Sequence, residues 1–246
     1  MATSPLTISD RAVFRGSRSI DVVLDWLRHQ ILSGEYPPGS RLPAERELAE
    51  EMGITRHTLR SAIGRLEAEQ LVDIRQGRGA TVLDYRTHGS LSLVTHLVRL
   101  GQQTRELIRG FLDIRRSMGA EAIAGACERA TEEELAELLR LAELQEQETM
   151  LDRFIERDIE FSRLTIRAAR NIPMELIFNE VALICRHHPA IQTLRLREMD
   201  MIRPTYRVAV ELIRQRDPDA ARNVLRHFMG VKDAHFLEVL MKAELF

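Results

Sequence analysis

Arg56, His57 and Arg60 stand out chemically because they follow Thr55 at the spacing of a single helical turn. Thr55 is a good N-cap, so a helix predicted over 56–70 begins with these side chains at its N-terminal end. A guanidinium presented there can hold the O6 and N7 edge of guanine, and Thr55 or Thr58 can reach a phosphate or a thymine methyl group. The pattern therefore predicts a helix that enters the major groove of DNA.

A second basic group lies in a turn between two short apolar runs and comprises Arg75, Gln76, Gly77 and Arg78. Runs of this length around a glycine-bearing turn predict a β-hairpin over 71–83. Glycine lets the backbone of its tip approach DNA closely, and an arginine there can enter the minor groove. Arg46, on a preceding predicted helix, is placed to touch the flanking phosphates.

A run of short elements within residues 18–85 must position these side chains. Apolar residues from Ile20 to Ile31 recur at helical spacing, Pro43 opens a short helix over 44–52, and Gly53 ends that helix. The order helix, helix, tight turn, helix, hairpin predicts a winged helix-turn-helix. Residues 1–17 are polar and aperiodic, and they predict a flexible arm.

The rest of the chain is predicted to be helical. A linker helix is expected over 86–102, and residues 103–246 form a series of amphipathic patterns without a strand signal. We therefore predict a mainly α protein, in which an N-terminal winged helix-turn-helix is followed by a C-terminal all-α helical bundle.

Composition narrows the function classes. The chain has 246 residues, of which 44% are apolar and 29% charged, which excludes a disordered or low-complexity protein. With two cysteines, no apolar run long enough to span a membrane and no signal-peptide core, a cytoplasmic protein is predicted. The net charge of the chain is −2 and that of residues 1–85 is −1, yet residues 55–80 carry +2. Positive charge is thus concentrated on the elements expected to touch DNA.

Two motifs, PGSRLPAERELA over 38–49 and GITRHTLR over 53–60, closely resemble the GntR family of bacterial transcription regulators. The second half resembles the ligand-binding domain of the FadR branch of that family. The resemblance implies a homodimer that binds a short inverted repeat in double-stranded DNA and responds to a small-molecule effector. It also implies operator contacts by the residues matching Arg46, Thr55, Arg56, Thr58, Arg60 and Gly77. His57 stands where many relatives have Ser or Thr, and Gln76 departs at the wing, so operator preference is expected to differ.

The same resemblance bears on a metal site. Domains of the FadR branch commonly bind a metal through an Asp, a His four residues on and two later histidines. Asp158 remains here, but Ser162, Tyr206 and Phe228 stand at the other three places. A single carboxylate cannot hold a divalent ion tightly, so neither a metal nor another cofactor is predicted. Whether His187, His188 or His227 rebuilds such a site is left open.

An effector cavity is predicted between helices of the bundle. Aromatic lining without a metal suits an acyl chain, and the FadR branch includes members that bind long-chain acyl-CoA. Asp158 is expected to be buried and to need a partner. The candidates for that partner are Arg115, Arg203 and Tyr206. Tyr206, Phe228, Arg115 and Ser162 are expected to line the cavity, with Arg109, Arg186 and His187 at its mouth. A purely structural polar cluster remains the alternative for each of these residues.

Two other functions stay open. One is a GntR regulator that responds to a small organic acid. The other is a helical sensor or enzyme whose N-terminal module binds protein. The sequence has no GxSxG, HExxH or P-loop motif, and its partial GxGxxG motif at Gly77 is followed by a strand, so an enzyme is not predicted.

Overall fold

A computed structural model of the chain describes residues 20–101, 104–187, 189–227 and 230. The predicted arm over 1–17, His188 and Phe228 lie outside these residues, and the side chains of 104–105 and 187–198 are also outside the description. The chain divides into two compact units, Met1–Leu100 and Gly101–Phe246. Each unit is described by itself.

The first unit is a winged helix-turn-helix, as predicted. Its helices are α2 (Ile20–Leu32), α3 (Glu45–Met52) and α4 (Arg56–Ala68), and its strands are β1 (Val72–Arg75) and β2 (Gly79–Val82). The predicted third helix extended to Gln70, which instead has a left-handed backbone with φ +57° just beyond the end of α4. Apolar faces of the three helices meet in one core, which includes Leu27, Leu48, Met52, Leu59 and Leu66.

A tight turn joins α3 to α4. Gly53 adopts a left-handed conformation with φ +67°, and its N–H donates to the carbonyl of Glu50, while the N–H of Ile54 donates to that of Ala49. This pair of bonds closes the last turn of α3. The Thr55 hydroxyl then accepts from the N–H of Thr58 at 3.1 Å and caps α4. The turn thereby sets where the first residues of α4 point.

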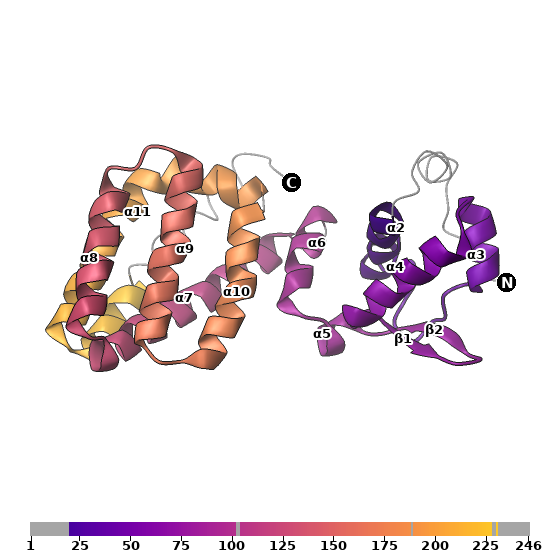
Figure 1. Ribbon diagram of the computed structural model, residues 1–246, viewed down its shortest axis with the longest axis horizontal. Coiled ribbons are helices and arrows are strands. Elements are labelled where there is room, and N and C mark those ends of the chain that lie inside the picture. Colours follow the sequence, from indigo (N-terminus) through magenta and orange to yellow (C-terminus); the bar gives the residue numbers. More distant parts are fainter. Residues whose placement is uncertain (1–19, 102–103, 188, 228–229, 231–246) are drawn as a thin grey trace. The chain divides into compact units, whose positions relative to one another are not determined.

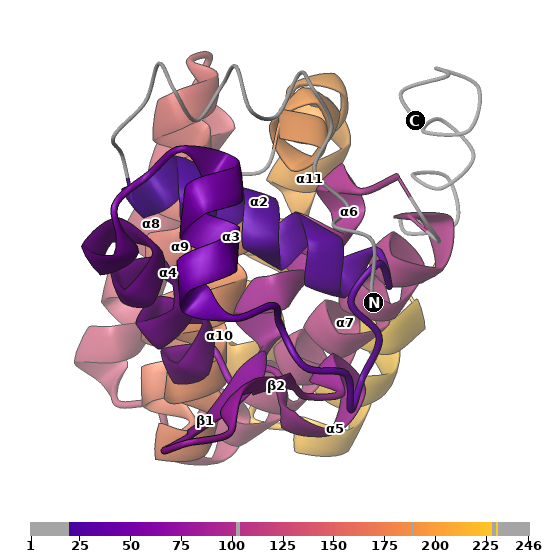
Figure 2. The ribbon, with the colours of Figure 1, turned by 90° about the vertical axis from the view of Figure 1, so that its right-hand side faces the viewer.

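The hairpin pairs β1 and β2 in antiparallel register, from Val72 opposite Val82 to Arg75 opposite Gly79. Gly77 at its tip has φ +75°, a conformation that glycine adopts without steric cost. Backbone bonds from Gly39 and Leu42 to β2 add a short extended segment beside it. Glu67 of α4 accepts from the N–H of Ile74, so the hairpin is also tied to the third helix. The hairpin lies on one side of the three helices in both views (Figures 1 and 2).

The predicted linker helix over 86–102 is divided into short pieces. These are α5 (Tyr85–His88), a 3-10 turn (Leu91–Leu93) and α6 (Val94–Arg99). Gly89, with an extended backbone, ends α5. Leu93 is buried in the core of the first unit, and Leu97 and Leu100 pack against that core. The segment up to Leu100 is therefore fastened to the winged helix-turn-helix by apolar burial.

The second unit is an all-α bundle, as predicted. It contains α7 (Thr104–Arg129), α8 (Glu132–Glu146), α9 (Leu151–Ala168), α10 (Ile172–His187) and α11 (Pro189–Gln215), and a further helical segment follows over 218–227. Its core includes Leu138, Phe154, Phe161, Tyr206 and Ile213. Helices α8, α9 and α11 pack against one another around this core, and α10 packs on α9.

None of the helices within the described residues combines the length and apolar character that crossing a membrane requires.

We predict that Gly53→Ala lowers the free energy of unfolding of the first unit by about 1–2 kcal/mol, because alanine must adopt the left-handed backbone at the turn. The matched control is Gly64→Ala inside α4, where an added Cβ meets nothing within 4 Å. That change should raise stability by up to about 1 kcal/mol. Trp26, the only tryptophan, packs against the core of this unit, so its fluorescence during urea unfolding reports both variants. Equal stability of the Gly53 variant and the parent would contradict the role given to the turn.

Candidate functional site

The N-terminal half of α4 presents one polar face. Arg56, His57 and Arg60 are all exposed, while Leu59 and Ile63 on the opposite side are buried. The alternation follows from helical periodicity, since residues one turn apart share a face. Thr55, the cap, is also exposed, and Thr58 is half-buried with its hydroxyl hydrogen-bonded to that of Thr55 at 2.9 Å. The α4 residues predicted to contact DNA bases therefore lie together on the surface of the first unit.

The two arginines of this face differ in their surroundings. Arg60 donates from Nε and Nη2 to Oε2 of Glu45, at 3.0 and 2.7 Å, so a carboxylate of α3 restrains it. These hydrogen bonds hold the pKa of Arg60 above its ordinary value. Arg56 forms neither a hydrogen bond nor an ion pair with the side chains that the structure describes. Arg46 is exposed on α3 and lies 3.9 Å from Glu50.

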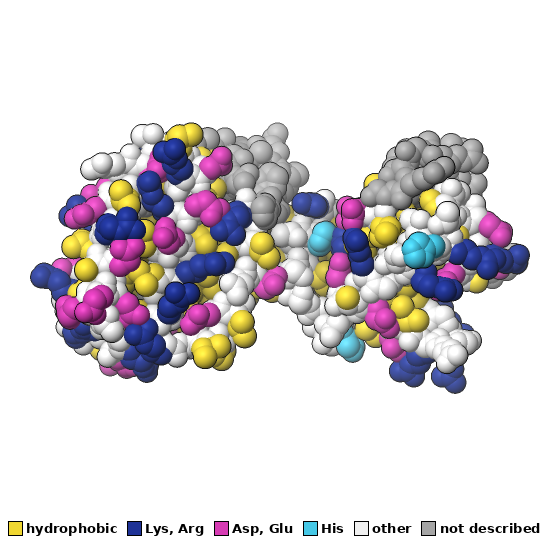
Figure 3. Space-filling model, viewed as in Figure 1, with side chains coloured by type: hydrophobic (Ala, Val, Ile, Leu, Met, Phe, Trp, Pro, Cys, Tyr) yellow, Lys and Arg dark blue, Asp and Glu magenta, His cyan; other side chains and the backbone are white. Residues whose placement is uncertain are grey.

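The tip of the hairpin is a second exposed basic group. Arg75, Gln76, Gly77 and Arg78 are all exposed, and Arg75 donates to Asp73 at 2.7 Å. In Figure 3, arginine side chains project from the hairpin and from the helices beside it, whereas basic and acidic side chains are interspersed over the second unit. Exposed guanidinium groups on a helix start and a neighbouring wing fit the two grooves and the backbone of DNA.

The predicted effector residues of the second unit are only partly brought together. The Tyr206 hydroxyl donates to Oδ1 of Asp158 at 2.7 Å, so Tyr206 is one of the expected partners that the structure brings to the carboxylate. Gln145 lies beside them and donates from Nε2 to Tyr206 at 3.3 Å and to the carbonyl of Phe154 at 2.8 Å. Edge-on rings of Phe154 and Phe161 enclose the Tyr206 ring.

Arg203, another expected partner of Asp158, donates hydrogen bonds to other residues. It donates to the carbonyl of Glu148 at 2.5 Å and to Asp200 at 2.6 Å. Glu148 is itself buried and pairs with Arg157 at 2.6 Å. Hydrogen bonds from the backbone N–H of Met150, followed by the nearby Arg157, hold the pKa of the Glu148 carboxyl below its ordinary value. This ionic cluster ties the segment between α8 and α9 to α9 and α11.

The other expected effector residues are more scattered. Ser162 and Arg115 are half-buried, Arg109 is exposed, and Arg186 pairs with Glu156 at 2.6 Å. The side chain of His187 and all of Phe228 lie outside the described residues.

The residues around Asp158 do not fit a divalent metal. Tyr206 and Ser162 supply a phenol and a hydroxyl where a metal site would have imidazoles. The phenol O–H of Tyr206 already donates its hydrogen bond to the carboxylate of Asp158. Within the described part of the chain, no three His, Cys, Asp or Glu side chains converge, and His227 is exposed.

Comparison with known proteins decides the family. Residues 20–82 match the family described as bacterial regulatory proteins, gntR family, and residues 111–230 match the FCD domain. The transcriptional regulator Mce2R of Mycobacterium tuberculosis is 31% identical over 226 residues, which cover 89% of this chain and 92% of that protein. This chain belongs to the GntR family. It is a transcription regulator of that family with an FCD domain, the effector-binding part of the protein.

This GntR-family regulator is also similar to a second regulator in sequence and to a solved structure in fold. A fatty acid metabolism regulator protein of Serratia proteamaculans is 31% identical over 156 residues, covering 63% of this chain and 64% of that protein. The solved structure of Lar, which controls expression of the Listeria monocytogenes agr system, is 21% identical and has a TM-score of 0.52. It covers 92% of this chain and 97% of that one, and at this identity the likeness supports the fold alone.

The sequence reasoning missed polar residues on buried helix faces. Gln145 is 1% exposed and follows Leu138 and Leu141 along the apolar side of α8, a position where a polar residue could have been noticed. Arg28 is likewise buried on α2, where it donates to both carboxylate oxygens of Glu69, at 2.8 and 2.6 Å.

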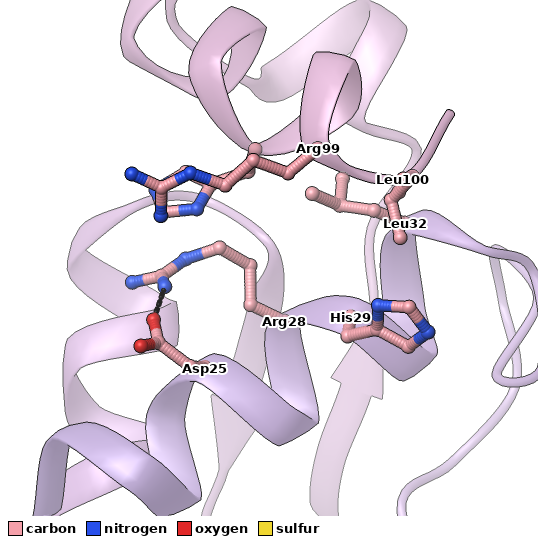
Figure 4. A pocket seen from close by; sticks show the side chains of 7 residues that line it. Asp25, Arg28, His29, Leu32, Arg99 and Leu100 are labelled. Carbon is pink, nitrogen blue, oxygen red and sulfur yellow. Dashed lines mark hydrogen bonds and ion pairs between the residues drawn. The ribbon is translucent and has the colours of Figure 1, made fainter. Parts of the chain in front are cut away.

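Arg28 also lines a pocket of about 150 Å³ between α2 and α6. Asp25 and His29 of α2 and His96 and Arg99 of α6 share its walls, and Figure 4 places the guanidinium groups of Arg28 and Arg99 opposite one another. Burial, and then the charge of Arg28, lower the pKa of His96. Both effects favour the neutral form of the His96 imidazole in this pocket.

We predict that Tyr206→Phe lowers the stability of the second unit by about 1–3 kcal/mol, because Asp158 loses a donor at 2.7 Å. The control is Tyr36→Phe in the first unit. The Tyr36 hydroxyl is buried without a hydrogen-bond partner among the described residues, and burial raises its pKa to about 12. Losing that hydroxyl should leave stability nearly unchanged or slightly higher. Far-UV circular dichroism reports the helices of both units, and Trp26 fluorescence reports the first unit alone, so a transition seen by circular dichroism but not by fluorescence belongs to the second unit. If the Tyr206 variant unfolds at the same urea concentration as the parent, the hydrogen bond between Tyr206 and Asp158 does not stabilise the second unit.

Proposed function

We propose that this regulator binds a specific DNA operator in the bacterial cytoplasm through α4 and the wing. One observation carries the proposal: Arg56 and Arg60 stand exposed on the face of α4 opposite its buried apolar side. An arginine in this position can discriminate guanine by two hydrogen bonds, at a value of about 1–3 kcal/mol per base pair. Thr55, Thr58, Arg46 and the wing residues Arg75, Gln76, Gly77 and Arg78 would add phosphate and groove contacts, and His57 would shape sequence preference.

We further propose that the protein acts as a homodimer on a short inverted repeat, because a twofold protein matches a palindromic site. Helix α10 supports this, since Ile172, Leu176 and Leu183 are exposed at helical spacing along one side. Exposed apolar stripes of this kind are typical of association surfaces.

The effector proposed for the FCD domain is an acyl-CoA or a related fatty-acid metabolite. Its support is the likeness to a fatty acid metabolism regulator and the aromatic surroundings of Tyr206. Asp158, Ser162, Arg115, Arg203 and Tyr206 would lie on the effector side. Arg109, Arg186, His187 and Phe228 remain candidates for the same site. A small organic acid is the second ligand class, and Arg203 with its buried Nε favours it.

Effector binding would reach DNA through the predicted linker, 86–102, between the DNA-binding residues 18–85 and the effector and dimerisation residues 103–246. Because α6 packs on the winged helix-turn-helix, a shift at the C-terminal end of α6 would move the DNA-binding elements. The ligand must bind one arrangement better than the other, since equal affinity for both would shift nothing.

We predict that Arg56→Ala lowers affinity for the operator by about 1–3 kcal/mol and leaves effector binding unchanged. Arg163→Ala is the control, because Arg163 is exposed on α9 of the other unit and its loss changes the net charge equally. Fluorescence anisotropy with upstream DNA at two salt concentrations measures both variants, and specific binding should weaken with salt. Equal loss in the two variants would show that only net charge matters. If the parent binds no genomic fragment, a module that binds protein is favoured.

We also expect freshly purified protein to carry a bound acyl-CoA and to have the mass of a dimer in native mass spectrometry. One spectrum tests both parts, because ligand mass and subunit number are read independently. Tyr206→Ala should lose the ligand and keep DNA binding by the apo protein. A bound organic acid would replace the ligand class, and a monomer would overturn the twofold arrangement.

A further inference from the structure

We propose that Glu45 is a positioning residue for Arg60, so that recognition of one operator base depends on α3 as well as α4. The inference rests on the proposed DNA binding and deepens it. Its basis is the contact across the helix-turn-helix in which both Nε and Nη2 of Arg60 donate to the same carboxylate oxygen of Glu45.

The donors of Arg60 can be followed individually. A guanidinium has five N–H groups in a fixed planar fork and cannot lose its charge. Glu45 takes Nε–H and one N–H of Nη2, at 3.0 and 2.7 Å. Both N–H groups of Nη1 and the other N–H of Nη2 stay available. The two that point along the end of the fork are parallel, and they match the O6 and N7 acceptors of guanine. The carboxylate thus occupies the side of the fork and leaves its reading end open.

Exposure supports a role at the surface. The Arg60 side chain is 73% exposed and that of Glu45 is 36% exposed, and an ion pair this open contributes little to folding stability. What the pair does restrain is a side chain with many rotamers, whose ordering otherwise opposes binding. Arg56 has no such restraint among the described residues, so the two arginines of one face are prepared differently.

Glu45 itself is firmly placed. It lies in the first turn of α3, where a carboxylate is stabilised by the helix dipole. Leu48 and Met52 of the same helix are fully buried, and the Gly53 turn fixes α3 against α4. The Glu45 carboxylate also repels DNA phosphates. Binding to a DNA sequence in which Arg60 finds no guanine therefore has a repulsive contribution that no base contact offsets.

The experiment uses the full chain and operators selected from a pool of randomised duplexes. Comparing the parent with Arg60→Ala identifies the base pair at which preference for guanine is lost. The measured quantity is then the dissociation constant for the duplex without that guanine divided by the dissociation constant for the duplex with it.

Glu45→Gln should reduce this ratio about tenfold. Glu50→Gln is the matched control, since Glu50 lies on the same helix, 3.9 Å from Arg46, and loses the same charge. It should strengthen binding to both duplexes alike and keep the ratio. Glu45→Asp retains the charge with a shorter reach, so it should also reduce the ratio. In an Arg60→Ala background, Glu45→Gln should reduce it no further. Trp26 fluorescence verifies that each variant is folded.

Each other outcome overturns the inference. If Glu45→Gln and Glu50→Gln leave the same ratio, the carboxylate does not position Arg60, while the proposed DNA binding stands. If Glu45→Gln still reduces the ratio without Arg60, the carboxylate acts through another group. If the parent selects no sequence from the pool, the proposed function itself fails.

Discussion

Burial of the apolar side of α4 is the constraint on which the DNA-facing surface depends. Leu59, Ile63 and Leu66 are 2% exposed or less, and burying side chains of this size contributes roughly 1.5–3 kcal/mol each. A rotation of α4 that turned Arg56 and Arg60 inward would expose these residues and bury charge, which is costlier still. The exposed arginine face is therefore a consequence of the core.

Arginine suits the contacts that surround this core. All but two of the 35 basic residues are Arg, and several join separate helices through two N–H groups, as Arg28 does with Glu69 and Arg60 with Glu45. A lysine offers a single flexible ammonium and could not fix direction in this way. The same chemistry that ties helices together in the interior can orient a reading side chain at the surface.

The second unit uses a different solution around Asp158. There the Tyr206 phenol donates a hydrogen bond to the carboxylate, and Gln145 and two aromatic rings surround the phenol. Hydrogen bonds from Gln145 to Phe154 and Tyr206, and from Tyr206 to Asp158, join α8, α9 and α11 at this centre. Any ligand that enters beside Tyr206 would disturb contacts on three helices, which is the kind of coupling an effector domain needs.

Local sequence determined the elements and their order. Periodic apolar residues mark the helices, Gly53 ends α3, and Thr55 and Thr131 cap the starts of α4 and α8. These preferences act within a few residues, so the winged helix-turn-helix and the bundle could be predicted. Tertiary structure alone decided which polar groups meet. Glu45 and Arg60, or Gln145 and Tyr206, are far apart along the chain, and their contact depends on how packed helices are rotated. Tertiary structure also decided that the 3-10 turn and α6 pack on the winged helix-turn-helix. Leu93 and Leu97 contact its apolar core, which residues close to them in the sequence do not predict.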